Sequence, residues 1–367
     1  MSAAATGPQP AGAGLGPASA AALADQHQQH QQQQLPPRGE PGATWCRRAA
    51  RAVRQRLADG QQLIREYQYI VALDDSIRHA SRDAVRADSA ARNRYANVLP
   101  YDYNRVHLPR LGEASPSYIN ASRITLQPPH TGGTADYIAT QGPLPHTAAD
   151  FWRMALDARA PLVVMLTNCV EKGAVKCAQY FPANPGEAAA FGGLRLEVLS
   201  RERFTPDCDR RTMRLSDAGG GGGGGGGALT LQHFHYHTWP DHGVPPSSAT
   251  LRRMCRELQR LNGGGGGAPP VVASAAPGGG GAGTPVLHCS AGIGRTGTFI
   301  AVDVLLRRID AWFREGGPTK DEVEAALDVP RLVHSLRQQR GGMVQTLEQY
   351  VFLYQAALDE LEERQAP

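Results

Sequence analysis

The chain has 367 residues and a formal net charge of +4 at pH 7, and its 42 glycines and 27 prolines are concentrated in particular stretches. Roughly 300 residues remain outside those stretches, enough for one large α/β domain with its own core. The charge is too small to argue for nucleic-acid binding. No stretch approaches the ~20 apolar residues that a membrane-spanning helix needs.

The cysteines and the N-terminus indicate the compartment. The six cysteines show neither CxxC spacing nor paired zinc-ligand spacing, and the N-terminus lacks the basic and apolar regions of a secretory signal. We therefore expect reduced thiols in a cytosolic or nuclear protein without a membrane span.

Residues 1–58 are predicted to be a disordered, low-complexity region. They are rich in Ala, Gly and Pro and contain a run of Gln and His from Gln26. Such a composition buries too little apolar surface to offset the entropy of the chain. Residues 47–57 are rich in arginine, which indicates either an extension of the first helix or a basic patch, and a solvated helix face is the simpler interpretation.

Residues 59–364 are predicted to form the folded domain, with glycine-rich inserts at 219–227 and 263–283. Helical spacing predicts an amphipathic helix at 61–71, and a continuous apolar run at 162–166 predicts a central strand buried on both faces. Further strands are expected at 194–199, 212–215 and 229–236, after a charged hairpin within 168–182. Further helices are expected after Thr147, after Ser247 or Ser248 through 258, at 299–313, from 321, from 329, and at 346–363.

The segment from Pro285 to Phe299 is predicted to bind an oxyanion. A short β-type run ends at Cys289, a helical pattern begins near Thr298, and between them lie Ser290, Ala291, Gly292, Ile293, Gly294 and Arg295. Small residues allow successive backbone N–H groups to point inward, the helix adds its positive dipole end, and the arginine adds a planar fork.

Cys289 lies where the same positive field acts on its sulfur. A free thiol titrates near ~8.5, whereas a thiol near a helix N-terminus and a fixed cation titrates at roughly 3.5–7.5. We therefore expect a thiolate at neutral pH, placed for in-line attack on a bound phosphate.

Two other interpretations of this segment are weaker. Residues 292–297 fit the dinucleotide pattern GxGxxG, but no second strand ending in an acidic residue follows, and the lysine of a Walker loop is absent. A structural cysteine in a tight turn would need no arginine six residues later.

Several motifs together resemble the protein tyrosine phosphatases. Residues 288–297, His-Cys-Ser-Ala-Gly-Ile-Gly-Arg-Thr-Gly, resemble the signature loop of that family, and residues 239–243, Trp-Pro-Asp-His-Gly, resemble its mobile acid loop. Other family motifs follow in order at residues 93–95, 118–121, 140–143, 171–173, 176–177 and 343–346. The match covers roughly residues 60–362, and the sequence of its motifs is most similar to that of receptor-type catalytic domains.

This resemblance implies a fold and an activity. The fold would be α/β (α+β), with a highly twisted mixed central sheet flanked by helices. The activity would be hydrolysis of phosphotyrosine in partner proteins through a cysteinyl-phosphate intermediate, without a metal or other cofactor.

The resemblance also implies a role for each matching residue. Cys289 would be the nucleophile, Arg295 would bind phosphate together with the loop residues, and Asp241 would act as general acid and then general base. The remaining implied positions are Gln345 and Gln349 for the hydrolytic water, Thr296 for breakdown of the phosphocysteine, Tyr95 for stacking on the substrate ring, Asn97 for the peptide backbone, Lys176 and Trp239 for the acid loop, Glu171 for orienting Arg295, and His288 for support.

Two other functions remain open at this stage. A catalytically weak phosphotyrosine-binding scaffold would usually lack the cysteine, the arginine or the aspartate, and Cys289, Arg295 and Asp241 are all present. A dual-specificity or lipid phosphatase is disfavoured by Tyr95, which makes the expected pocket deep.

Overall fold

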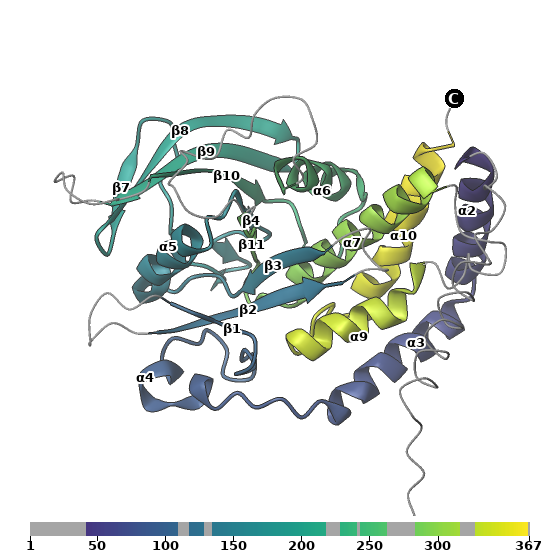
Figure 1. The fold of residues 1–367 in the computed structure, drawn as a ribbon, viewed down its shortest axis with the longest axis horizontal. Helices are drawn as coiled ribbons and strands as arrows, with labels where there is room; N and C mark the ends of the chain where they lie inside the picture. Colours follow the sequence, from purple (N-terminus) through teal and green to yellow (C-terminus); the bar gives the residue numbers. More distant parts are fainter. Residues whose placement is uncertain are drawn as a thin grey trace, which may run out of the picture.

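A mixed β-sheet forms the centre of the protein (Figure 1). The computed structural model describes residues 42–108, 117–127, 134–217, 228–240, 243–262, 283–315 and 327–365. Within them the nine strands of the main sheet lie in the order β1-β2-β3-β11-β4-β10-β9-β8-β7, and β5 pairs with β6 separately. The strands are β1 (Arg105–His107), β2 (Tyr118–Leu126), β3 (Ala135–Thr140), β4 (Leu162–Met165), β5 (Val170–Glu171), β6 (Ala174–Val175), β7 (Ala188–Phe191), β8 (Leu194–Thr205), β9 (Cys208–Asp217), β10 (Leu229–Tyr236) and β11 (Val286–His288).

The middle of the sheet is parallel, and its two central strands, β11 and β4, are fully buried. Strand β11 pairs in parallel with β3 and β4, and β4 pairs in parallel with β10, whereas the outer pairs are antiparallel. Along β4, Val164 contributes to one apolar cluster and Val163 to the other, so both faces of the strand are covered. This confirms the central strand predicted at 162–166, because side chains alternate between the two faces of a sheet.

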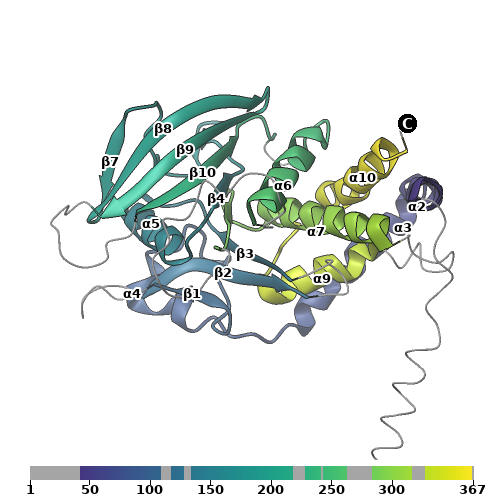
Figure 2. The same ribbon diagram turned by 45° about the horizontal axis from the view of Figure 1, so that its top comes forward.

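Helices cover both faces of the sheet (Figure 2). Phe151 and Trp152 of α5 lie in one apolar cluster, and Phe299 and Leu305 of α7 lie in the other. The mixed sheet flanked by helices confirms the expected fold class. The α-helices described are α2 (Gly42–Ala58), α3 (Gly60–Leu73), α4 (Ala87–Ala90), α5 (Ala148–Asp157), α6 (Ala249–Asn262), α7 (Gly294–Glu315), α9 (Val329–Gln339) and α10 (Leu347–Glu363).

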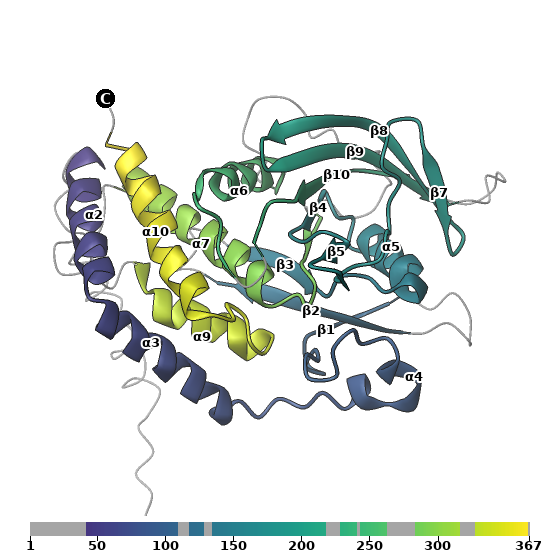
Figure 3. The ribbon, with the colours of Figure 1, turned by 180° about the vertical axis from the view of Figure 1, so that it is seen from behind.

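The N-terminal helix α2 corrects one prediction. Residues 42–58 were expected to be disordered with the rest of 1–58, yet they form a helix beside α10, continued by α3 along α9 (Figure 3). Trp45 is 1 % exposed and meets the edge of Trp312 at 6.2 Å between ring centroids. The arginines between the apolar positions hid this amphipathic pattern, and the helix extension considered for 47–57 is the correct reading. Residues 1–41 lie outside the described part.

Most other predicted elements are present with small changes of boundary. The strand expected at 194–199 continues to Thr205, because its charged second half is held by pairing with β9. The two glycine-rich inserts, apart from Gly283, and the helix expected from 321 lie outside the described residues. Among the helices that are described, none is both long and apolar enough to cross a bilayer.

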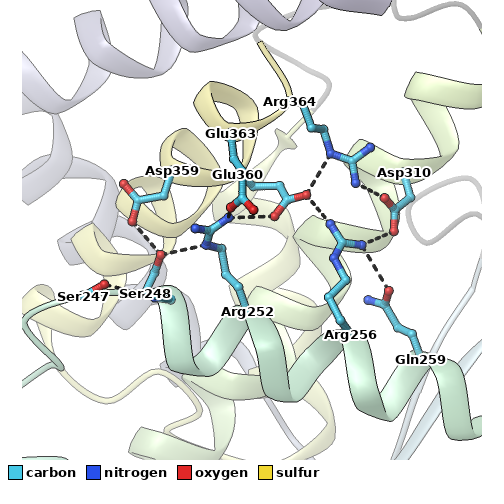
Figure 4. A network of polar contacts seen from close by, with 11 residues as sticks. Ser247, Ser248, Arg252, Arg256, Gln259, Asp310, Asp359, Glu360, Glu363 and Arg364 are labelled. Carbon is cyan, nitrogen blue, oxygen red and sulfur yellow. Dashed lines mark hydrogen bonds and ion pairs between the residues drawn. The ribbon is translucent and has the colours of Figure 1, made fainter. Parts of the chain in front are cut away.

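A network of ion pairs joins α6 and α7 to α10 (Figure 4). Glu360 of α10 accepts hydrogen bonds from Arg252 at 2.9 Å, from Arg364 at 2.8 Å, and from Arg256, which also pairs with Asp310 of α7. Burial would raise the pKa of Glu360, but the charge of Arg256 and the other arginine contacts outweigh it, so the pKa lies below its ordinary value of 4.5. The ionised carboxylate is therefore the form that holds these helices together.

Glu360→Ala is expected to lower the free energy of unfolding by up to about 3 kcal/mol, because it leaves three partly buried arginines without their shared partner. The matched control is Glu362→Ala on the same helix, whose pair with Arg54 is exposed (54 % and 42 %) and contributes at most about 1 kcal/mol. Urea unfolding measures both variants. The folded-state pKa is depressed, so the Glu360 contribution should be complete above its ordinary value and lost as pH falls through the lowered pKa. An equal, pH-independent loss in both variants would contradict this.

Candidate active site

The loop between β11 and α7 contains the predicted oxyanion site. Cys289 follows the carboxyl end of a central parallel strand, where ligands commonly bind in α/β sheets, and Gly294 begins the 22-residue helix α7. The backbone N–H of Gly292 donates a hydrogen bond to the Cys289 sulfur at 3.2 Å. The loop therefore curls around the sulfur, and at least one of its amides points inward.

Gly292 has a conformation and a position that only glycine fits. Its φ is +74°, and a Cβ placed there would lie 2.1 Å from the carbonyl oxygen of Thr140. The close approach follows from the pairing of β11 with β3, which ends at Thr140. The glycine therefore permits both the turn and the contact with the neighbouring strand.

Gly292→Ala is expected to lower the free energy of unfolding by about 3 kcal/mol or more, because backbone strain and a clash act together. Gly173→Ala is the matched control, since Gly173 has φ +78° but open space around its Cβ position. That control should show only the strain, about 1–2 kcal/mol. Chemical denaturation of the two variants separates the effects, and equal losses would argue against the clash.

Arg340 supports the loop from behind, and sequence reasoning missed it. Its fully buried guanidinium donates to the carbonyl oxygens of Gly292 at 2.9 Å and Ala291 at 3.0 Å, and to the Asn120 side chain at 2.7 Å. These bonds hold the two carbonyls away from the inside of the loop. Burial lowers the pKa of Arg340 to about 10, so the residue is still a cation at neutral pH. The only signal in the sequence that could have pointed to Arg340 was its position three residues before Met343, the first residue of the family motif at 343–346.

Arg295 is held in place by Glu171. Its two terminal nitrogens donate to the two carboxylate oxygens at 2.7 and 2.9 Å, and one of them also donates to the Leu166 carbonyl at 3.0 Å. Glu171 in turn accepts from the Thr167 hydroxyl and the Asn168 amide. Burial opposes ionisation of Glu171, but the bonds from Arg295 and its other donors lower its pKa overall. This bidentate pair fixes the plane of the guanidinium, and it joins the two residues that the family resemblance implied would meet.

The predicted acid loop reaches the same guanidinium. The Pro240 carbonyl accepts a hydrogen bond from Arg295 at 3.4 Å. Trp239 is 3 % exposed, donates through its indole to the Gly243 carbonyl at 3.0 Å, and packs against Tyr236. The two ends of the loop are thus tied together. Asp241, the predicted acid, lies outside the described residues.

His288 is a buried neutral support. Its Nδ1 lies 2.9 Å from the Cys289 carbonyl and its Nε2 lies 2.7 Å from the Tyr180 hydroxyl. Burial lowers the pKa of His288 to about 4, so the ring is uncharged at neutral pH and Nδ1 must carry the proton that the carbonyl accepts. Tyr180 then donates to His288 and accepts from His233, 2.9 Å away. Sequence reasoning did not identify Tyr180 as this bridge.

Tyr95 lies at the side of the loop. Its hydroxyl is 2.8 Å from that of Ser290, which also donates to the Lys176 carbonyl at 2.9 Å. Arg94 holds the Tyr95 segment by donating to the Gly142 and Pro143 carbonyls. The structure therefore brings together the predicted residues at 95, 176 and 290. Asn97, by contrast, is exposed and makes no hydrogen bond to another described residue that would fix its side chain.

The side chains of Gln345, which precedes α10, and of Gln349, which lies in α10, approach Gly294 at the start of α7. A Cβ on Gly294 would lie 3.1 Å from the side-chain amide of each, and the Gln345 backbone donates to the Gln349 side chain at 2.8 Å. Thr296 is fully buried, and its hydroxyl oxygen has no hydrogen-bond partner among the described residues. Ile293 is buried, packed in the main apolar cluster. Both amides and a free hydroxyl thus lie around the loop.

Comparison with known proteins gives one consistent family. The family model described as Protein-tyrosine phosphatase matches residues 89–359. The human Receptor-type tyrosine-protein phosphatase H is 38% identical over 304 residues, 82% of this chain and 24% of that protein. The human Receptor-type tyrosine-protein phosphatase eta is 37% identical over 277 residues, 74% of this chain and 18% of that protein.

A plant relative has a length closer to that of this chain. The Arabidopsis thaliana Protein-tyrosine-phosphatase PTP1 is 34% identical over 282 residues, 76% of this chain and 73% of that protein. The chain therefore spans a quarter or less of the two receptor-type relatives and most of the plant one.

Proposed function

The chain belongs to the protein-tyrosine phosphatase family, and from this premise we propose that it hydrolyses phosphotyrosine in proteins through a cysteinyl-phosphate intermediate. The observation that carries the proposal is the arrangement around Cys289. An inward amide donates to its sulfur, and Arg295 is held at the end of the same loop by two hydrogen bonds that it donates to Glu171. We expect a dianionic phosphate to bind between these donors, above the sulfur.

The proposed first step is transfer of the phosphoryl group to Cys289. The thiolate attacks phosphorus in line with the ester oxygen, while Arg295 and the loop amides stabilise the equatorial oxygens. Asp241 donates a proton to the leaving phenolate oxygen. Closure of the loop at Trp239 and Pro240 would bring the acid to the ester and exclude water. The contact between Pro240 and Arg295 supports this placement.

The proposed second step is hydrolysis of the phosphocysteine. Gln345 and Gln349 position a water, Asp241 now accepts its proton, and Cys289 leaves as a thiolate. The Thr296 hydroxyl is buried close to this loop and is available to stabilise the leaving sulfur. The amides beside Gly294 support the position of the water.

The proposed substrate class rests on Tyr95. A tyrosine ring beside Ser290 would stack on the substrate ring and make the pocket deep, so that a phosphoseryl or phosphothreonyl side chain would not reach Cys289. Asn97 would accept a hydrogen bond from the peptide backbone, and Lys176 would meet the acid loop.

The proposed setting is a reducing compartment, the cytosol or nucleus, with a role in signal transduction. All six cysteines are free, which suits such a compartment. Fractionation of cells that express the chain tests the location.

The direct test is release of phosphate from a phosphotyrosyl peptide by the purified full chain, with chelator and reductant present. We expect turnover of this peptide and none of the matched phosphothreonyl peptide or of a phosphoinositide. Binding of the phosphotyrosyl peptide without turnover would identify a scaffold instead. Comparable turnover of the lipid or the phosphothreonyl peptide would refute the deep pocket.

A further inference from the structure

Cys169 and Cys177 flank the hairpin formed by β5 and β6. The Cys169 carbonyl accepts hydrogen bonds from two successive amides, Lys176 at 2.8 Å and Cys177 at 3.3 Å. Two residues just after β6 therefore oppose one residue just before β5, which is the hydrogen-bond pattern of a β-bulge at the base of the hairpin. The bulge adds one residue to the second strand and thereby brings the side chain of Cys177 to that of Cys169.

The two sulfur atoms meet at one acceptor. The carbonyl oxygen of Ala178 accepts a hydrogen bond from the Cys169 sulfur at 3.7 Å and another from the Cys177 sulfur at 3.2 Å. The thiols also hydrogen-bond to each other. Both sulfurs therefore lie against one oxygen atom, and the backbones of the two cysteines are joined directly by the hydrogen bond from the Cys177 amide to the Cys169 carbonyl.

The environments of the two thiols differ in the way that a reactive pair requires. Cys169 is partly exposed, and the hydrogen bond from Cys177 lowers its pKa to about 7 against the opposing effect of burial. Cys177 is 1 % exposed, and its hydrogen bond to Cys169, together with burial, raises its pKa. Cys169 is thus the thiolate that an oxidant can reach, and Cys177 is the thiol beside it.

We propose that Cys169 and Cys177 form a peroxide-sensitive pair that closes an intramolecular disulfide across the bulge at the base of the β5–β6 hairpin. The Cys169 thiolate attacks one oxygen of hydrogen peroxide, the O–O bond breaks, and the departing hydroxide takes up a proton to become water. The resulting sulfenic acid is attacked by the Cys177 sulfur. The S–S bond forms, the S–O bond breaks, and the hydroxyl leaves as water with the Cys177 proton, so two electrons pass from the sulfurs to the peroxide.

The position of the pair connects it to the candidate active site. The hairpin contains Glu171, which holds Arg295, and the Lys176 carbonyl beside Cys177 accepts from Ser290. A Cβ on Gly142 would lie 3.2 Å from the Cys177 Cβ and 2.8 Å from the Cys289 carbonyl, so Cys177 packs close behind the loop. The disulfide would close the hairpin covalently without using the Cys289 sulfur.

The experiment uses the full chain carrying Cys289→Ser, which removes the other expected reactive thiol. The protein is treated with hydrogen peroxide, quenched with catalase, alkylated, and digested with trypsin without reductant. Lys172 and Lys176 lie between the two cysteines, so a disulfide would join two otherwise separate peptides. We expect the joined pair, its disappearance on reduction, and an intact mass lower by two hydrogen atoms.

Two sets of variants sharpen the result. Added Cys169→Ser or Cys177→Ser should each abolish the joined pair, and in the latter Cys169 should be trapped by dimedone as a sulfenic acid. Cys208 and Cys255 are fully buried with pKa values raised mainly by burial, and they should be alkylated only after unfolding. Recovery of Cys169 and Cys177 as separately alkylated or separately oxidised peptides would overturn the proposal. If Cys177→Ser does not fold, the partly exposed Cys169→Ser gives the same test.

Discussion

Replacing Cys289 with serine is expected to lower the rate of phosphotyrosyl-peptide hydrolysis by a factor on the order of 10⁴–10⁶, as removal of a nucleophile does elsewhere. A serine hydroxyl is almost entirely protonated at neutral pH and is a far weaker nucleophile than a cysteine sulfur, so attack on phosphorus should be slow. The side chains are close in size, and Cys289 is 5 % exposed, so the loop should keep its shape and its affinity for the phosphopeptide.

Single-turnover kinetics and calorimetric binding measure these two quantities. Cys169→Ser, assayed in reductant, is the matched control, because it also removes one sulfur but should leave hydrolysis unchanged. Undiminished hydrolysis by Cys289→Ser would refute the covalent intermediate. Loss of both hydrolysis and binding, with the fold intact by circular dichroism, would mean that the sulfur supports the loop rather than the chemistry.

Asp241→Ala is expected to lower kcat by roughly 10²–10⁴, the usual contribution of a general acid or base, while the phosphopeptide remains bound. The wild-type rate should fall as pH rises through the pKa of the protonated acid, because the leaving phenolate then receives no proton. The variant should lack this fall. Asp217→Ala, at the exposed end of β9, is the matched control and should retain the wild-type rate and profile.

The decisive measurement is the pH profile of kcat, compared between substrates whose phenol leaving groups differ in acidity. A substrate with an acidic phenol needs no proton on departure, so the variant should lose much less rate with it. If Asp241→Ala hydrolyses both substrates at the wild-type rate, another residue supplies the proton. If the variant instead binds the phosphopeptide and hydrolyses it slowly, its capture of phosphotyrosyl proteins from a lysate would identify physiological substrates.

The local features of the site could be predicted because their causes are local. Cys289, Gly292 and Arg295 are close in sequence between a strand and a helix, so the turn and its donors follow from residue type and spacing. The same holds for the apolar strand β4. The contact between Glu171 and Arg295 was expected only through the family resemblance, because the two residues are 124 positions apart.

Features that depend on distant partners could not be predicted from residue type. Arg340 carries no pattern that shows whether its guanidinium faces solvent or the loop carbonyls 48 residues away. Tyr180 could not be recognised as a bridge until β10 and β11 placed His233 and His288 beside it. Helix α2 was missed because it packs against α10, and Trp45 against Trp312 of α7, and both partners lie far along the chain.

The sequence alone determined the chemistry that this protein carries: a cysteine, an arginine and an inward-turning glycine loop in one short segment. Those properties depend on covalent neighbours and on the backbone conformations that each residue type allows, and both follow directly from the order of the residues. Only the tertiary structure decided how the loop is held: Arg340 behind it, Glu171 beside it and the Cys169–Cys177 bulge below the hairpin. The contacts of Arg340 and Glu171 join residues 48 and 124 positions apart, so they exist only after distant parts of the chain have folded together.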